Sequence, residues 1–162
     1  MDDVVRRTFF RAMPCVSDEL SRMPLSGWNE SVFRYFFCRS LSEAHPDVTQ
    51  FVECDRIDLV LHRAEEKAFI EFKFYLRAPK FDPYTGRRSG LKGGPGPRNL
   101  DEFRRCVDQL HGRKPVHGLS KYIVLVYADP IGGSTTANRY STHYDDYAHW
   151  NEKISLDPMP FR

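Results

Sequence analysis

Two short segments of the chain carry charged side chains among residues that favour β-strands. Residues 56–61 and 69–74 are rich in branched and aromatic side chains. A hairpin that turns at residues 64–65 would place Asp58 directly opposite Glu71. Two facing carboxylates repel each other unless a positive charge joins them, and a divalent cation is the natural candidate. The spacing therefore predicts metal chemistry at this hairpin.

Side chains alternate along a strand, so the same hairpin divides its residues between two faces. One face is entirely apolar and is predicted to be buried; it carries Ile57, Leu59, Leu61, Ile70, Phe72 and Phe74. The other face carries Arg56, Asp58, Glu71 and Lys73, together with Val60 and Phe69. A solvated face with cross-strand ion pairs to Arg56 and Lys73 would explain the same residues without a metal.

The elements that must position this hairpin follow from periodicity and from turn residues. The sequence predicts a short helix over residues 3–12 that breaks before Pro14, a helix over 27–42 capped by Ser26, a strand over 48–54, a helix over 101–111 that Gly112 ends, and a strand over 122–128 buried on both faces. This order favours an α/β domain with a mixed central β-sheet flanked by helices.

Length and composition narrow the class of protein. The 162 residues suit a single domain, with its core over residues 27–128 and a polar extension over 131–162 that has a helix near 140–150. No apolar run approaches the ~20 residues of a membrane span, and residues 1–4 lack the layout of a secretory signal. The four cysteines have no C-x-x-C spacing, which argues against a zinc site and a disulfide framework. Free cysteines favour a reducing, cytoplasmic compartment.

A basic segment rich in glycine and proline follows the hairpin. Residues 76–100 show no periodicity, which predicts a long unstructured insertion. The formal net charge is only +2, so the local distribution of charge decides where nucleic acid would bind. We expect it to bind this loop, whose cations are Arg77, Lys80, Arg87, Arg88, Lys92 and Arg98. Phe81 and Tyr84 could stack on bases, and a solvated flexible insertion is the alternative.

Glu30, Asp58 and the tripeptide Glu71-Phe72-Lys73 together resemble the PD-(D/E)XK nuclease superfamily. In that superfamily an acid and a D/E-x-K tripeptide lie on adjacent strands of a mixed sheet with helices on both sides, the restriction-endonuclease-like fold. The resemblance covers residues 28–128. The prototype has a proline before the aspartate; this chain, like many members, lacks it.

The resemblance implies a Mg²⁺ or Mn²⁺ ion bound by Asp58, Glu71 and the backbone carbonyl of Phe72, with Glu30 as an outer ligand. Lys73 would assist the attack of water on the phosphodiester. Elementary chemistry agrees, because Mg²⁺ prefers oxygen ligands, keeps several waters and lowers the pKa of bound water.

The resemblance also directs attention to the helix over residues 101–111. Some members carry a glutamine on the helix after the tripeptide that contacts the active site or the nucleic-acid backbone, and Gln109 has a similar place. Arg105, one turn earlier, is an equal candidate for a phosphate contact. The structural alternatives are an exposed helical glutamine at 109 and, for Glu30, a salt bridge to Arg34 four residues later.

We therefore expect a magnesium-dependent nuclease that hydrolyses phosphodiester bonds in DNA, with RNA as the other candidate substrate. The alternative is a catalytically inactive module on the same fold that binds nucleic acid or a protein. In such a module the acids would have a structural role. Binding of Mg²⁺ or Mn²⁺ by Asp58 and Glu71 separates the two. The sequence leaves open a homodimer, which would let so small a nuclease cut both strands.

Overall fold

The computed structural model describes residues 1–20, 22, 28–75, 78–82, 84–92, 97–114 and 116–127. Within them, four strands form one sheet in the order β1-β2-β3-β6, and these are β1 (Thr49–Cys54), β2 (Ile57–Arg63), β3 (Glu66–Tyr75) and β6 (Leu119–Tyr127). The first three pair antiparallel, whereas β6 runs parallel to β3. The predicted α/β class and the mixed sheet are confirmed.

The β2–β3 hairpin has the register that the sequence predicts. Leu59 pairs with Ile70, and the same register continues to the turn at residues 64–65. Both strands extend further toward this turn than predicted. Asp58 and Glu71 are the next residues beyond the last pair, so the register brings the two acids to one end of the paired region.

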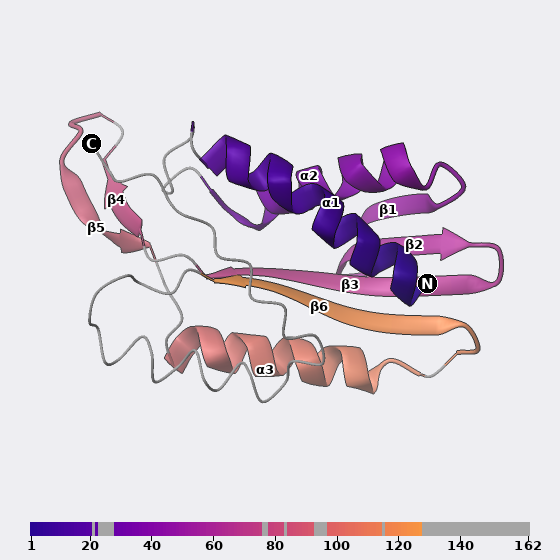
Figure 1. Ribbon diagram of the computed structural model, residues 1–162. Helices are drawn as coiled ribbons and strands as arrows, with labels where there is room; N and C mark the ends of the chain where they lie inside the picture. The colour runs from indigo at the N-terminus through magenta and orange to yellow at the C-terminus, as the bar shows by residue number, and fades with distance from the viewer. Residues whose placement is uncertain are drawn as a thin grey trace.

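Helices cover both faces of the sheet (Figure 1). α1 (Asp2–Leu20) and α2 (Glu30–Ala44) pack together on one face, and α3 (Pro97–Gly112) lies on the other. The main core lies beneath α1 and α2 and includes Val5, Val16, Phe33, Phe37, Leu41, Leu59, Leu61, Ile70, Phe72 and Phe74. Two smaller clusters form where α3 packs, one with Tyr75, Leu100 and Phe103 and one with Ile57, Val60 and Leu110.

The start of β2 departs from the predicted faces. Ile57 was expected on the apolar face with Leu59, and this prediction is wrong, because Ile57 packs with Val60 and Leu110 on the α3 side. β2 begins directly after a turn in which residues 55–56 have positive φ. The regular alternation is therefore established only from Leu59 onward.

The first helix is longer than predicted. The expected break before Pro14 does not occur, since α1 continues through the proline to Leu20. A proline inside a helix removes one backbone hydrogen bond and costs about 3 kcal/mol. Met13 and Val16, on either side of Pro14, are buried in the core and offset this cost.

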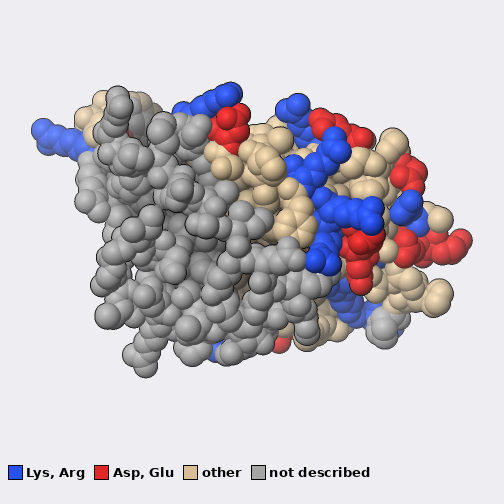
Figure 2. Space-filling model, viewed as in Figure 1, with Lys and Arg blue, Asp and Glu red and all other residues tan. Residues whose placement is uncertain are grey.

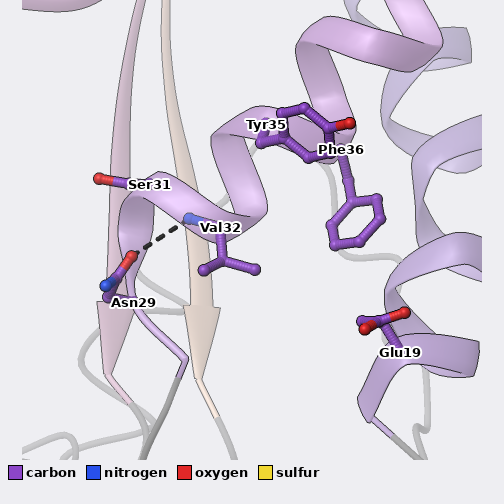
Figure 3. Close-up of a pocket in the computed structure, with 6 residues that line it drawn as sticks. All are labelled: Glu19, Asn29, Ser31, Val32, Tyr35 and Phe36. Carbon is purple, nitrogen blue, oxygen red and sulfur yellow. Dashed lines mark hydrogen bonds between the residues drawn. The ribbon is translucent and has the colours of Figure 1, made fainter. Parts of the chain in front are cut away.

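α2 also begins later than predicted, at Glu30. Its N-cap is Asn29, whose side-chain Oδ1 accepts a hydrogen bond from the backbone N–H of Val32 at 3.1 Å (Figure 3). Asparagine is as good an N-cap as serine. Ser26, the predicted cap, lies outside the described residues. The later start puts Glu30 in the first turn, where the helix dipole favours a negative charge.

The segment from α3 to β6 confirms one prediction and corrects another. α3 covers the predicted 101–111 and begins earlier, at Pro97, a residue that suits the first helical position. Gly118, with φ +74°, leads into β6, and an added Cβ would lie 2.5 Å from the carbonyl oxygen of Glu65. The expected burial of the last strand on both faces is wrong: residues 119–126 are half-buried, since β6 is the outermost strand of the described sheet.

The glycine- and proline-rich segment is not the unstructured insertion that we predicted. It contains a second, two-stranded sheet of β4 (Ala78–Phe81) and β5 (Arg88–Lys92). Asp82 organises the connecting turn, because its Oδ1 accepts hydrogen bonds from the backbone N–H groups of Tyr84 and Thr85 at 3.0 and 2.7 Å. The extension over 131–162, with its predicted helix, lies outside the described residues.

Candidate functional site

Asp58 lies where β2 and β3 cease to pair. Its Oδ2 accepts a hydrogen bond from the backbone N–H of Phe72 at 2.7 Å. Its Oδ1 is 3.3 Å from the guanidinium of Arg34 in α2. The side chain of Asp58 therefore binds the N–H of Phe72 just beyond the last β2–β3 pair, and both of its oxygens have a partner.

Glu71 is the least solvated acid of the site. The residue is only 5% exposed, and its Oε1 is buried without a hydrogen-bond donor among the described residues. Burial, the charge of Asp58 and a hydrogen bond that the protonated carboxyl makes to Asp58 raise the pKa of Glu71 to about 7. A buried carboxylate oxygen without a donor is costly, so this atom is available to a ligand that carries positive charge.

Lys73 lies between two carboxylates from helices on opposite faces of the sheet. Its Nζ is 3.6 Å from Oε1 of Glu30, at the start of α2, and 3.8 Å from Oε1 of Glu102, in α3. Burial alone would lower the pKa of this ammonium, but the negative charges of Glu30 and its neighbours outweigh burial and raise it. Lys73 is therefore a permanent cation at neutral pH.

Glu30 reaches the site, but it does not form the salt bridge to Arg34 that was the structural alternative. Arg34 pairs with Asp58 and with Glu53, and Glu30 pairs with Lys73. Burial raises the pKa of Glu30, the charge of Lys73 lowers it, and the charge of Asp58 raises it again, with a net increase. The acids of the site thus interact electrostatically as one group.

Glu102 is a site residue that sequence reasoning missed. It lies in α3, between Asp101 and the buried Phe103, and its side chain is 44% exposed. No local pattern connects it to Lys73, because the contact depends on how α3 crosses the sheet. The one available signal was its position next to a core residue, at the edge of the buried side of a predicted helix.

The turn between β1 and β2, just before Asp58, is held by α3 and by the residue that follows it. Asp55 and Arg56 have φ values of 50° and 64°, a left-handed conformation that is unfavourable for residues other than glycine. Arg113 contacts the side chain and the carbonyl of Asp55 at 2.6 and 2.7 Å. Gln109 donates a hydrogen bond from Nε2 to the carbonyl of Arg56 at 3.2 Å. Gln109 therefore has a structural contact, and its predicted contact with nucleic acid stays a prediction.

The structure places some of the predicted nucleic-acid contacts and leaves others undescribed. Arg87, Arg98 and Arg105 are exposed, and Arg105 donates from Nε to the carbonyl of Asp101. Arg77 lies outside the described residues, as do the side chains of Lys80, Arg88 and Lys92. Figure 2 shows basic and acidic side chains interleaved over α1, so the described part of that face mixes both signs of charge.

The acids fit a cation held by few protein ligands. Asp58 and Glu71 face each other, and Oε1 of Glu71 has no donor within the part of the chain that the structure describes. Mg²⁺ commonly takes one or two carboxylates and fills its remaining positions with water. No group of three or more His, Cys, Asp or Glu side chains in the described part of the chain is arranged to hold a metal. The donor set therefore fits a two-carboxylate site and not an all-protein cage.

An open pocket lies elsewhere, between the end of α1 and the first turns of α2 (Figure 3). It is lined by Glu19, Asn29, Ser31, Val32, Tyr35 and Phe36. None of the acids that surround Lys73 lines this pocket, so it is separate from the candidate site.

Comparison with protein-family models, curated proteins and solved structures finds no match to this chain. Among the described helices, none is both long and apolar enough to cross a membrane.

Proposed function

We propose that this protein is a metal-dependent nuclease of the PD-(D/E)XK type on a restriction-endonuclease-like fold, acting on DNA. One observation carries the proposal: the carboxyl of Glu71 faces Asp58, and its buried Oε1 has no donor among the described residues, two residues from a buried lysine. A helix-borne acid, Glu30, reaches the same lysine, and its role as an outer ligand of the ion belongs to this proposal. A reducing compartment fits the four cysteines, all of which are free.

Asp58 and Glu71 would hold Mg²⁺ or Mn²⁺, with the carbonyl of Phe72 as a further ligand. When bound, such an ion acidifies a water molecule and neutralises negative charge on phosphorus. Asp58 is already oriented by the N–H of Phe72, so it pays little conformational entropy on binding. Glu71 would give up its proton to bind the ion, because the positive charge would offset the burial and the charge of Asp58 that raise its pKa.

Lys73 would act as a cation and not as a base. The carboxylates around it raise the pKa of its ammonium, so it holds its proton at neutral pH. A fixed positive charge near the attacked phosphate stabilises the negative charge that develops in the transition state. Glu30 and Glu102, one on each side, keep this ammonium in place. Arg87, Arg98 and Arg105, with the cations of the β4–β5 hairpin, would bind the phosphate backbone.

Cleavage of supercoiled plasmid and of labelled DNA and RNA oligonucleotides with Mg²⁺ or Mn²⁺ tests the proposal. We expect the nearly isosteric Asp58→Asn and Glu71→Gln variants, and Lys73→Met, to lose at least about 100-fold in rate. Asp101→Asn, a change to an exposed acid on α3, is the matched control and should cut at the wild-type rate. Wild-type rates in all three site variants, with folding verified by circular dichroism, would refute the proposal.

The contacts also support a second candidate, a non-catalytic binding module on the same fold. Arg34 neutralises Asp58, and Lys73 lies between Glu30 and Glu102, so most charges of the site already have a partner without a metal. In a binding module these ion pairs would be structural. The protein would then bind nucleic acid equally well with Mg²⁺ or with a chelator and would cut neither DNA nor RNA.

A further inference from the structure

Arg34 is an internal cation that contacts one of the two facing acids. Its side chain is only 12% exposed, and its Nη1 is 2.6 Å from Oε1 of Glu53 and 3.3 Å from Oδ1 of Asp58. One nitrogen of the guanidinium thus connects an acid of β1 to an acid of β2. The shorter contact is to Glu53, whose side chain is 68% exposed and therefore free to move with the arginine.

The oxygens of the two facing acids are not equally available. Oδ2 of Asp58 accepts from the N–H of Phe72, and Oδ1 faces Arg34. Glu71 has a buried oxygen to which no described residue donates a hydrogen bond. A divalent ion that uses both acids can take this oxygen of Glu71 at once, whereas it reaches Oδ1 of Asp58 only when Arg34 withdraws.

We propose that Arg34 is a built-in competitor of the divalent cation, and that ion binding transfers its guanidinium from Asp58 to Glu53. The inference rests on the metal site of the proposed function and adds a residue that sets the affinity of that site. Two positive groups cannot share one carboxylate oxygen without strong repulsion. The opposite role, in which Arg34 orients Asp58 for the ion, predicts effects of the opposite sign.

Binding of Mn²⁺ to the full chain, without nucleic acid and at about pH 8, tests the inference. Electron paramagnetic resonance measures free Mn²⁺ and therefore needs no catalysis. We expect Arg34→Met to bind Mn²⁺ about tenfold more tightly than wild type, because the competing charge is gone. We expect Glu53→Gln to bind about threefold more weakly, since Arg34 then has only Asp58 as a partner.

Arg39→Met is the matched control, because Arg39 lies on α2 and pairs with the exposed Glu43, away from the acids. It should leave Mn²⁺ affinity unchanged. Glu53 is exposed, so Glu53→Gln gives a result even if Arg34→Met does not fold. If wild type binds Mn²⁺, two results would overturn this inference alone. One is an affinity that Arg34→Met leaves unchanged or weakens, and the other is an affinity that Glu53→Gln leaves unchanged. Absence of Mn²⁺ binding in wild type and in both variants would overturn the metal site as well.

Discussion

On one face of β3, Phe72 packs its ring against Phe33 and Phe37 of α2, with ring centroids 5.9 and 5.5 Å away. The residues on either side of it in the strand, Glu71 and Lys73, are also buried but are surrounded by charged groups. Apolar packing distributes the stability of the first face over many contacts. On the second face, each charge depends on a few named partners. The same strand therefore provides both the core and the site, and substitutions on its two faces should differ in size and in pH dependence.

The largest effect is expected on the apolar face. Phe72→Ala should lower the free energy of unfolding by about 3–5 kcal/mol, because it leaves a cavity among the aromatic rings of the main core. Urea denaturation followed by circular dichroism measures the change. Tyr84→Ala, which removes an aromatic ring that is 95% exposed, is the control and should change stability by less than about 0.5 kcal/mol. Equal losses in both variants would contradict the division between the two faces.

On the charged face, a substitution should raise the free energy of unfolding at high pH instead of lowering it. Glu71 has a pKa of about 7 in the folded protein and an ordinary value of 4.5 when unfolded. It is protonated in both states at pH 4. As the pH rises from about 4.5 to about 7, the unfolded chain ionises this carboxyl while the folded protein keeps it protonated, so stability falls until the folded carboxyl has ionised as well. Glutamine cannot ionise, so Glu71→Gln should be more stable than wild type by about 1–3 kcal/mol at pH 8.5.

The measurement is urea denaturation at pH 4 and pH 8.5 with a chelator present. The advantage of Glu71→Gln should disappear at pH 4. Glu65→Gln, at the exposed turn of the hairpin, is the control and should show no such pH dependence. A difference of the same size at both values would mean that Glu71 is not held in its protonated form by the site.

The smallest effect concerns the backbone that leads into the charged face. Arg56 has φ +64°, and glycine adopts this conformation without steric cost. Arg56→Gly should therefore stabilise the protein by up to about 1 kcal/mol, measured by thermal unfolding. Lys67→Gly, in β3, should instead destabilise it by about 0.5–1 kcal/mol. A loss of stability in both variants would show that the Arg56 side chain matters more than its backbone.

Local signals predicted those parts of the molecule that depend on neighbouring residues. The register of β2 and β3 follows from alternation and from a two-residue turn, and the pairing of Leu59 with Ile70 confirms it. β1 and α3 likewise carry their own periodicity. The β4–β5 hairpin carries a local signal of its own, since Asp82 and Gly86 are turn residues at suitable spacing.

The rest depends on tertiary contacts. Pro14 stays helical because Met13 and Val16 are buried against the core, which the local sequence does not reveal. At the site, the facing of Asp58 and Glu71 and the place of Glu30 could be predicted. The contacts of Arg34 with Asp58 and of Glu102 with Lys73 could not, because each joins a helix to a strand far along the chain.

The parallel pairing of β3 with β6 has a consequence for biosynthesis. β6 follows α3 in the chain, so β3 acquires its second neighbour only after every other described element has left the ribosome. Until then a hydrophobic strand presents unpaired amides and carbonyls along its whole length, and such edges recruit strands of other molecules. Fragments that stop before residue 119 should accordingly accumulate as insoluble material in expression hosts, whereas in the described sheet β6 covers this edge of β3.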